Sequence, residues 1–305
     1  MKILVAGSSG LIGRALVSAL RADGHEVTRL VRGSASGPGE ASWSPSFGQL
    51  PLELCATSDV IVNLCGTPID GARWSARRRA ELRSTRIDPT QALAKLFRGA
   101  EPGLRPGLLV NASAIGIYGD RGNLELTESS EPGNGFLAEL CRDWESAALS
   151  AAESGARVAC LRFGPVLSRE GGALQRMVPF YRAGLGGALG SGRQWTSWVS
   201  LDDVVGALRF VICEERISGP VNVVAPNATT NSGFDRALSR IFGRQVGMSI
   251  PRFALRAAYG QIADEVLLAS AHVVPAKLVS AGYSFLYPNL EDALYQALAL
   301  EKSDS

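Results

Sequence analysis

Residues 1–13 read MKILVAGSSGLIG, an apolar run followed by glycines at positions 7, 10 and 13. The run over 3–6 is too short for a helix and rich in β-favouring residues, which predicts a buried strand. Leu16, Val17 and Leu20 then recur at helical spacing. The sequence therefore predicts that the chain starts with a strand, a glycine turn and a helix.

The three glycines have separate mechanical roles in such a turn. Gly7 allows a tight turn out of the strand, Gly10 lets backbone amides approach a pyrophosphate, and Gly13 lets the helix pack close to the sheet. The helix N-terminus then directs free N–H groups and a positive dipole end at the phosphates. Glycines also occur in ordinary loops, but the flanking strand and helix favour dinucleotide binding. A P-loop is set aside, because Ile12 stands where its second glycine belongs and no lysine follows.

The second predicted strand, residues 27–32, ends where a dinucleotide fold contacts the adenosine ribose. An acidic residue there would bind a 2′-hydroxyl and favour NAD. This strand ends in Arg32, and a guanidinium suits a 2′-phosphate through charge-assisted hydrogen bonds. We therefore expect NADP(H), with a hydroxyl contact from Ser34 as an addition; the alternative is that Arg32 is a solvated surface arginine.

Composition excludes several classes of partner. The 305 residues carry 31 Lys+Arg against 29 Asp+Glu, and a net charge of +2 gives no electrostatic case for nucleic acid or an anionic membrane. No segment is apolar for the roughly 18 residues that a membrane helix needs. The five cysteines are scattered, and neither histidine lies near Cys, Asp or Glu in a metal-ligand spacing, so we expect no metal site and a reducing cytoplasmic location.

Further strands are predicted at 59–64, 108–111 and 158–163, with helical patterns between them. Strands alternating with helices predict an α/β fold with a doubly wound parallel sheet. We expect a dinucleotide-binding domain over 1–225, with 167–200 contributing to a substrate lobe, and a mostly helical lobe over 226–305. Asp202 and Asp203 precede a helical pattern, where acids usually cap the helix.

The strand over 59–64 ends in a second candidate cofactor segment, Asn63-Leu64-Cys65-Gly66. A glycine at the carboxyl edge of a parallel sheet lets the backbone approach a bound cofactor. We therefore add Asn63, Cys65 and Gly66 to the candidate site.

Four motifs carry a resemblance to the extended short-chain dehydrogenase/reductase superfamily, which includes nucleotide-sugar epimerases. They are the glycine turn, Ile117-Tyr118-Gly119-Asp120, Leu161-Arg162-Phe163-Gly164 and the stretch over 198–204. The chain is most similar to an atypical subgroup described as "epimerase family protein". The subgroup marks are Arg73-Trp74, the stretches 84–87 and 113–119, Trp144-Glu145 and, in the tail, 274–278 and 282–285.

The resemblance implies an extended Rossmann fold with a bound nicotinamide dinucleotide. It places the pyrophosphate on the glycine turn, the 2′-phosphate on Arg32 and the adenosine beside Cys65 and Gly66. The nicotinamide would lie beside Phe163, Gly164 and Val166. The turn residues so implied are Gly7, Ser9, Gly10, Leu11, Ile12 and Gly13.

The chain departs from the superfamily at its catalytic positions. Active members carry a Tyr and a Lys four residues apart on one helix, where Leu137 and Cys141 stand here. The superfamily's Ser or Thr position falls at Ala114, with Ser113 one residue earlier. Leu and Cys side chains cannot supply that proton chemistry, so Tyr118 and Ser113 are the candidate catalytic residues.

Two functions follow from this pattern. The first is an NADP(H)-dependent oxidoreductase or epimerase that acts on a small carbonyl or sugar-like substrate with a rearranged catalytic set. The second is a non-catalytic NADP(H)-binding sensor or regulatory protein, since a fold alone does not decide function. The family implies a monomer or a homodimer.

Overall fold

The first strand of the fold is β1 (Lys2–Ala6), in which Ile3, Leu4, Val5 and Ala6 are each at most 1% exposed. A parallel strand covered on both faces needs a continuous apolar run, which explains why this stretch lacks polar alternation. The computed structural model of the chain describes residues 1–45, 52–70, 73–99, 105–245 and 247–300.

Six further strands join β1 in the main sheet, which is seven-stranded within the described residues. They are β2 (Glu26–Val31), β3 (Glu40–Ser42), β4 (Val60–Asn63), β5 (Leu108–Ala114), β7 (Arg157–Phe163) and β11 (Gly219–Val223). Their order is β11-β7-β5-β4-β1-β2-β3, and the pairings from β3 to β5 are parallel. The predicted doubly wound sheet is confirmed, and its strand order reverses between β1 and β4. Ligands of such sheets bind outside the carboxyl ends of the strands at that reversal.

The chain forms two compact units from interleaved segments. The first comprises Met1–Ser113, Leu140–Arg162 and Val205–Val221; the second comprises Ala114–Glu139, Phe163–Val204 and Asn222–Ser305. The domain limits expected from the sequence, 1–225 and 226–305, stay a prediction.

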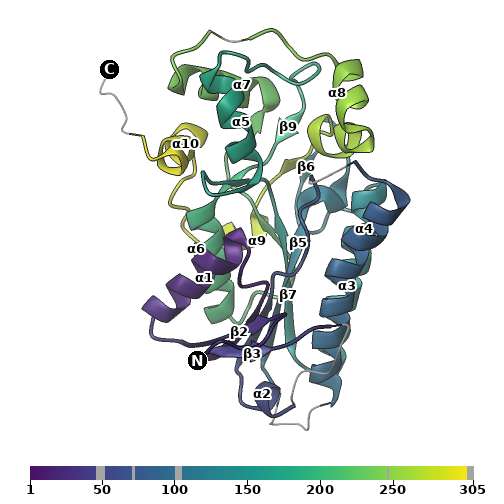
Figure 1. Cartoon of the computed structure of the whole chain (residues 1–305), viewed down its shortest axis with the longest axis vertical. Helices are drawn as coiled ribbons and strands as arrows, with labels where there is room; N and C mark the ends of the chain where they lie inside the picture. The colour runs from purple at the N-terminus through teal and green to yellow at the C-terminus, as the bar shows by residue number, and fades with distance from the viewer. Residues whose placement is uncertain (46–51, 71–72, 100–104, 246, 301–305) are drawn as a thin grey trace. The chain divides into compact units, whose positions relative to one another are not determined.

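Helices cover both faces of the sheet in the first unit (Figure 1). α3 (Ala76–Gly99) and α4 (Phe136–Leu149) lie on one side; α1 (Leu11–Ala22) and α6 (Leu201–Cys213) lie on the other. The short α2 (Leu52–Ala56) and η2 (Ser150–Ser154) complete the unit. Apolar residues repeat along α3 at Leu82, Leu93 and Phe97, and all three are fully buried. This face of α3 is therefore anchored by the hydrophobic effect.

The second unit is built from short strands and helices. Its strand pairs are β8 (Val166–Leu167) with β10 (Val199–Ser200), β9 (Trp195–Thr196) with β12 (Thr229–Thr230), and β6 (Glu125–Leu126) with β13 (His272–Val273). Its helices are η1 (Ile115–Tyr118), α5 (Gly172–Arg182), α7 (Asn231–Ile241), α8 (Arg252–Tyr259), the π-helical η3 (Ala263–Leu267), α9 (Ala276–Ser280) and α10 (Leu290–Leu298).

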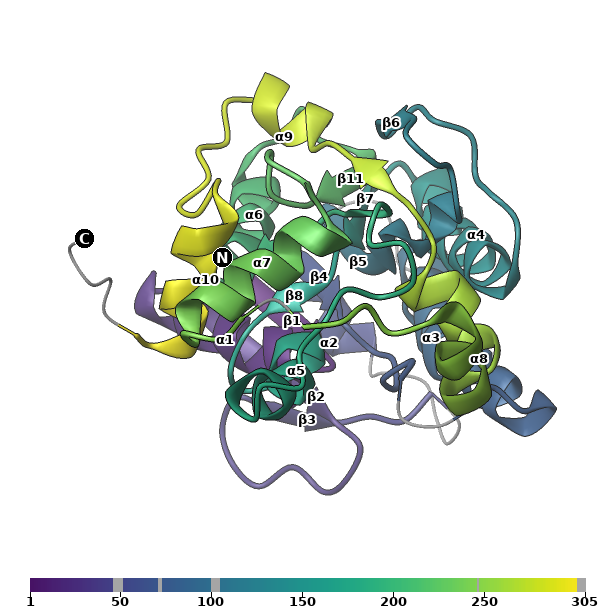
Figure 2. The same ribbon diagram turned by 90° about the horizontal axis from the view of Figure 1, so that it is seen from above.

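A separate apolar core holds this second unit together. α7 lies beside α10 (Figure 2), and Trp198, Leu238 and Leu294 are completely buried in the cluster that joins them. The helical C-terminal portion expected from the sequence is thus present. No helix among the described residues combines the length and apolar composition of a membrane span.

Candidate functional site

The glycine turn occupies the carboxyl end of β1, and two independent constraints, backbone conformation and lack of space for a Cβ, require its first residue to be glycine. Gly7 has a φ of +76°, a left-handed conformation that side chains rarely adopt. A Cβ at Gly7 would also lie 2.5 Å from the carbonyl carbon of Leu64 and 2.9 Å from the nitrogen of Cys65. The turn and the segment after β4 therefore meet at backbone contact distance, which joins two of the predicted cofactor segments.

The other two glycines of the turn have different surroundings. A Cβ at Gly13 would lie 2.3 Å from the carbonyl oxygen of Gly7, so this residue allows α1 to pack directly against the turn. A Cβ at Gly10 would meet a single atom, that same oxygen, at 3.4 Å. The space beside Gly10 is therefore open toward solvent, and Ser9 and Gly10 are both exposed.

At the N-terminus of α1, no side chain in the described part of the chain accepts a hydrogen bond from the first amides. Gly10 is the N-cap residue and supplies no side chain, and the first turn of α1 contains no acidic residue. The N–H groups of Leu11, Ile12 and Gly13 lie in that first turn, where helical N–H groups have no intrahelical partner. Free amides and the positive end of the helix dipole make this turn a cradle for a phosphate group.

Asn63, at the end of β4, is bound inside the first unit. Its Nδ2 donates to Thr90 Oγ1 (2.8 Å) and to Asn111 Oδ1 (2.7 Å), and its Oδ1 accepts from the Cys65 amide (3.2 Å). The residue is fully buried. These contacts orient the backbone that leads into Cys65 and Gly66.

Cys65 and Arg32 interact electrostatically at this edge of the sheet. Burial raises the pKa of the half-buried Cys65 thiol to about 11, and the positive charge of Arg32 opposes that rise. Arg32 itself is exposed, and within the described residues it forms no ion pair or hydrogen bond. Its guanidinium is thus available to an anion beside the segment after β4.

Arg86 on α3 lies directly behind Gly66. Its Nη1 and Nη2 donate to the carbonyl oxygens of Leu82 (3.2 Å) and Thr67 (2.9 Å), and its Cζ lies 5.3 Å from the Trp144 ring centroid. Burial lowers the pKa of this guanidinium. Arg86 lies in the subgroup mark 84–87 but was not among the predicted site residues, although its spacing from Leu82 places it on the buried face of α3, where a charged residue is unusual.

A groove of about 420 Å³ runs along the outer flank of the glycine turn, between α1 and β2. It is lined by Ser8, Ser9, Arg14, Val17, Ser18, Arg21 and Arg29. Hydrogen bonds from Ser36, and then the charges of Arg29 and Arg21, hold the pKa of Glu40 below its ordinary value.

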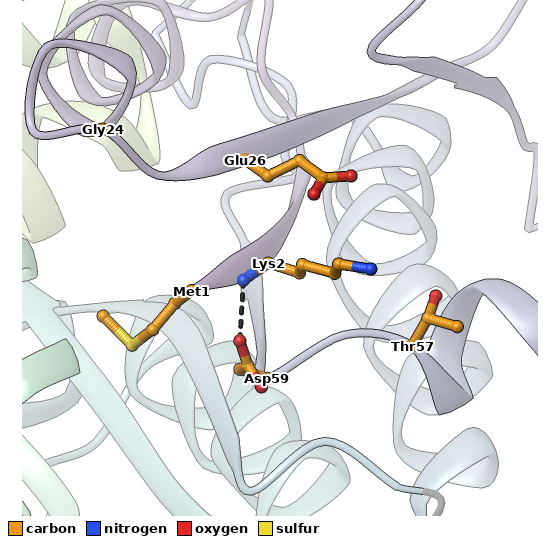
Figure 3. Close-up of a pocket in the computed structure, with 6 residues that line it drawn as sticks. All are labelled: Met1, Lys2, Gly24, Glu26, Thr57 and Asp59. Carbon is orange, nitrogen blue, oxygen red and sulfur yellow. Dashed lines mark hydrogen bonds between the residues drawn. The ribbon is translucent and has the colours of Figure 1, made fainter.

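A second hollow, of about 570 Å³, lies at the opposite edge of the sheet (Figure 3). The Lys2 amide donates to Asp59 Oδ2 there (2.7 Å), and Glu26 lies on the other wall. This hollow is at the amino ends of the strands and carries two carboxylates. It therefore suits a phosphate-bearing ligand less well than the carboxyl edge does.

Ser113 belongs to a buried ionic cluster in the first unit. Its hydroxyl donates to Glu145 Oε1 (2.6 Å), and Glu145 accepts two bonds from Arg162, at 2.8 Å and 2.9 Å. All three residues are at most 6% exposed. The arrangement fixes the end of β5 to α4 and β7.

Tyr118 is completely buried in the second unit. Its hydroxyl has Asn222 Oδ1 at 2.7 Å and the Thr127 carbonyl oxygen at 3.0 Å as acceptors. Asn222 is held in turn, because its Nδ2 donates to the Val274 carbonyl oxygen (2.9 Å). The phenol is thus part of an internal hydrogen-bond network.

The predicted nicotinamide-side residues also lie in the second unit. Phe163 and Val166 are half-buried, and Gly164 donates its amide to the Val223 carbonyl oxygen (3.2 Å). A Cβ at Gly164 would lie 2.3 Å from the carbonyl oxygen of Ser197, so only glycine fits there. The roles predicted for these three residues stay predictions.

The two positions where the superfamily has its Tyr and Lys are apolar and buried. Leu137 is 8% exposed and Cys141 is 3% exposed, both on α4. A Cβ at Gly116 would lie 3.3 Å from the Leu137 Cβ, so the leucine packs against the segment that carries Tyr118.

A sequence profile described as "NAD dependent epimerase/dehydratase family" matches residues 3–224. The chain belongs to this family. A second profile, a domain of unknown function (DUF1731), matches residues 250–297 of this epimerase/dehydratase-family chain. This match, together with the epimerase-family relatives described next, confirms the predicted assignment to the extended short-chain dehydrogenase/reductase group.

Three relatives show how close the similarity is. Epimerase family protein Mb2239 of Mycobacterium bovis is 44% identical over 292 residues, covering 96% of each chain. The crystal structure of human epimerase family protein SDR39U1 (isoform 2) with NADPH has a TM-score of 0.89 at 33% identity, covering 98% of this chain and 100% of that one. MoeE5 in complex with UDP-glucuronic acid and NAD, at 19% identity, 98% coverage of each chain and a TM-score of 0.76, shares the fold.

Proposed function

We propose that this chain binds NADP(H) and uses it to oxidise, reduce or epimerise a small carbonyl or sugar-like substrate. The observation that carries the proposal is the glycine turn, where the first amides of α1 have no side-chain acceptor among the described residues and the side of Gly10 is open. A pyrophosphate fits such a cradle in charge and in hydrogen bonding. The NADPH bound by human SDR39U1 supports the same cofactor here.

The preference for NADP(H) over NAD(H) rests on Arg32. An exposed guanidinium without a partner in the described part of the chain, close enough to act on Cys65, can bind a phosphate on the adenosine ribose. When bound, the nicotinamide supplies hydride transfer. The chain's own residues supply binding: the amides of α1 hold the pyrophosphate, and Asn63 orients the backbone of Cys65 and Gly66 beside it.

The proposal also gives Tyr118 and Ser113 catalytic roles. A proton carrier must lie within hydrogen-bond reach of the group that it serves. The Ser113 hydroxyl donates to Glu145, and Tyr118 has two internal acceptors. A role in proton transfer therefore requires that the substrate replace one of these partners.

A second candidate function is favoured by the same contacts. With Leu137 and Cys141 at the Tyr and Lys positions, and with both candidate hydroxyls bonded internally, an NADP(H)-binding sensor without turnover explains the site equally simply. Both proposals include the cytoplasmic localisation that was expected from the sequence. Both also include a small molecule as the binding partner.

Two measurements separate these candidates. NADPH binding is followed by fluorescence titration, and turnover by the absorbance of NADPH with a panel of carbonyl and nucleotide-sugar compounds. Turnover that is lost in Tyr118→Phe supports the enzyme, whereas tight binding without turnover on any compound supports the sensor. The cofactor proposal fails if neither NADPH nor NADH binds. The assignment of Arg32 fails if Arg32→Ala leaves the ratio of NADPH to NADH affinity unchanged.

A further inference from the structure

The positions from which the superfamily transfers a proton hold no side chain that is ready to donate one. Leu137 has no ionisable group, and Cys141, a weak donor, is 3% exposed. The Ser113 hydroxyl donates to the Glu145 carboxylate (2.6 Å), and the Tyr118 hydroxyl is buried against two acceptors. A substrate that suits these positions is one whose reduction needs no proton from the protein.

Carbonyl compounds differ in how much they need such a donor. A hydride added to the carbon of a simple ketone leaves the negative charge on one alkoxide oxygen, and an alcohol holds its proton about as tightly as water, with a pKa of roughly 16. A quinone that gains a hydride leaves a phenolate, and the pKa of a phenol is about 10. The second anion is about a millionfold less basic, so it forms without a donor beside it and takes its proton from water.

A stacked aromatic pair in the second unit is suited to a flat conjugated ring. The rings of Trp195 on β9 and His272 on β13 have centroids 4.1 Å apart and planes 11° from parallel. The indole Nε1 of Trp195 donates to Asn123 Oδ1 (3.2 Å), which fixes the orientation of the ring. Both members of the pair are half-buried, so part of the pair stays open to a ligand. Aromatic side chains stack on further planar rings in this way.

The segment that carries Trp195 also passes a residue predicted to lie beside the nicotinamide. A Cβ at Gly164 would lie 2.3 Å from the carbonyl oxygen of Ser197, two residues after Trp195. Ser197 is bonded to the chain around β13, because its Oγ donates to the Ala271 carbonyl oxygen (2.8 Å) and accepts from the Val273 amide (2.9 Å). The same backbone within one unit therefore holds the aromatic pair and the predicted nicotinamide neighbour.

We propose that the hydride acceptor of this chain is a flat, conjugated carbonyl compound of the quinone class, bound against the Trp195–His272 pair and protonated by water. The inference rests on the proposed function, of which it names the substrate class. The reaction is NADPH + quinone + H⁺ → NADP⁺ + hydroquinone. A C–H bond of the dihydronicotinamide breaks, and its hydrogen, with both electrons, forms an O–H bond at one quinone oxygen. The displaced electron pair passes through the ring to the other oxygen, which takes a proton from water.

The first test compares two carbonyl compounds at saturating NADPH, followed by the absorbance of NADPH in the absence of oxygen. Duroquinone is fully conjugated, and all its ring carbons are substituted, so the exposed Cys213 thiol cannot add to it. Cyclohexanone has a six-membered ring without the conjugation. We expect kcat/KM to be at least about a hundredfold higher for duroquinone, since a general acid that only the ketone requires contributes that much. The rate with duroquinone should be little changed in heavy water, because no proton moves with the hydride.

The second test measures the binding of duroquinone to the complex with NADP⁺, which does not turn over, by equilibrium dialysis. Trp195→Leu and His272→Leu should each weaken duroquinone by about tenfold and leave the dissociation constant of NADP⁺ within about twofold. Trp195→Phe keeps a ring and loses the hydrogen bond to Asn123, so it should recover most of the loss if stacking is the cause. Tyr259→Leu, which removes an exposed aromatic ring elsewhere in the second unit, is the matched control.

The outcomes are distinguishable. If cyclohexanone or a nucleotide sugar turns over faster than duroquinone, the inference is overturned and the proposed enzyme stands with another substrate. A marked slowing in heavy water overturns it as well, as does unchanged duroquinone binding in Trp195→Leu. Tight NADPH binding with no turnover of either compound overturns it in favour of the sensor. If the unmodified chain does not bind NADPH, the proposed function fails, and not this inference alone.

Discussion

The substitutions Gly10→Ala and Gly13→Ala should differ in effect: the first should weaken cofactor binding alone, and the second should also destabilise the fold. The two glycines are three residues apart in one turn, but the space for a Cβ differs: 3.4 Å from the nearest atom at Gly10 against 2.3 Å at Gly13. The first distance is an ordinary contact. The second requires the backbone to move, since the atom it meets is the carbonyl oxygen of Gly7.

The expected magnitudes follow from these distances. Gly10 has φ −71°, which alanine adopts freely, so Gly10→Ala should change the free energy of unfolding by less than about 1 kcal/mol. Gly13→Ala overpacks a backbone contact and should cost about 1–3 kcal/mol. The methyl group at Gly10 occupies the open side of the cradle. It should therefore weaken NADPH by about tenfold or more, the equivalent of one lost charged hydrogen bond.

The assay is urea unfolding followed by tryptophan fluorescence, paired with NADPH titration of each folded variant. Gly10→Ala is expected to unfold at the urea concentration of the unmodified chain and to bind NADPH poorly. Gly13→Ala is expected to lose both stability and binding. Unchanged NADPH affinity in Gly10→Ala would refute the proposal that the glycine turn binds the cofactor phosphates. A stability loss in Gly10→Ala as large as that in Gly13→Ala would refute the inference that a Cβ fits at Gly10 but not at Gly13.

Three other predictions concern particular side chains. Glu145→Gln leaves the buried Arg162 without its counter-charge and should lower the free energy of unfolding, measured in urea, by about 3–5 kcal/mol. A decrease below about 1 kcal/mol would contradict this prediction. The pKa of about 11 keeps the Cys65 thiol protonated near pH 8, so its alkylation by iodoacetamide, followed by mass spectrometry, should be slow at pH 8 and faster toward pH 11. Arg32→Ala removes a positive charge that lowers this pKa, so the variant should react more slowly than the unmodified chain. An equal or faster rate in the variant would contradict the prediction. Asp203→Ala removes the carboxylate that accepts hydrogen bonds from the amides of Leu286 and Tyr287, and it should lower the free energy of unfolding by about 2–3 kcal/mol in the same urea assay. A change within about 0.5 kcal/mol would show that these two hydrogen bonds do not hold the tail in place.

Local patterns were sufficient for the predicted sheet and the glycine turn. The apolar run of β1 and the helical spacing in α1 are both properties of neighbouring residues, so the first strand, turn and helix were predicted near their observed bounds. The predicted strand over 27–32 corresponds to β2 at Glu26–Val31. Boundaries shifted by a residue or two because the ladder hydrogen bonds that define strand ends depend on the neighbouring strand.

Side-chain partners far apart in the chain could not be predicted this way. Asp203 was expected to cap α6, but in the structure its amide donates to Ser200 Oγ (2.9 Å), so the serine supplies this capping acceptor. Its carboxylate, however, accepts the amides of Leu286 (2.7 Å) and Tyr287 (3.0 Å), more than eighty residues later. The same holds for the internal acceptors of Tyr118, which come from Thr127 and Asn222.

The sequence by itself determined the glycine turn, the parallel sheet and the absence of Tyr and Lys at Leu137 and Cys141, since these depend on residue type and spacing along one stretch of chain. Only the tertiary structure decided that Gly7 touches the backbone after β4 and that Gly10 is open while Gly13 is closed. It also brought Arg14 and Arg29 to the same turn from a helix and a strand. The physical reason is that a hydrogen bond or a backbone contact depends on distance in space, which packing sets and sequence separation does not.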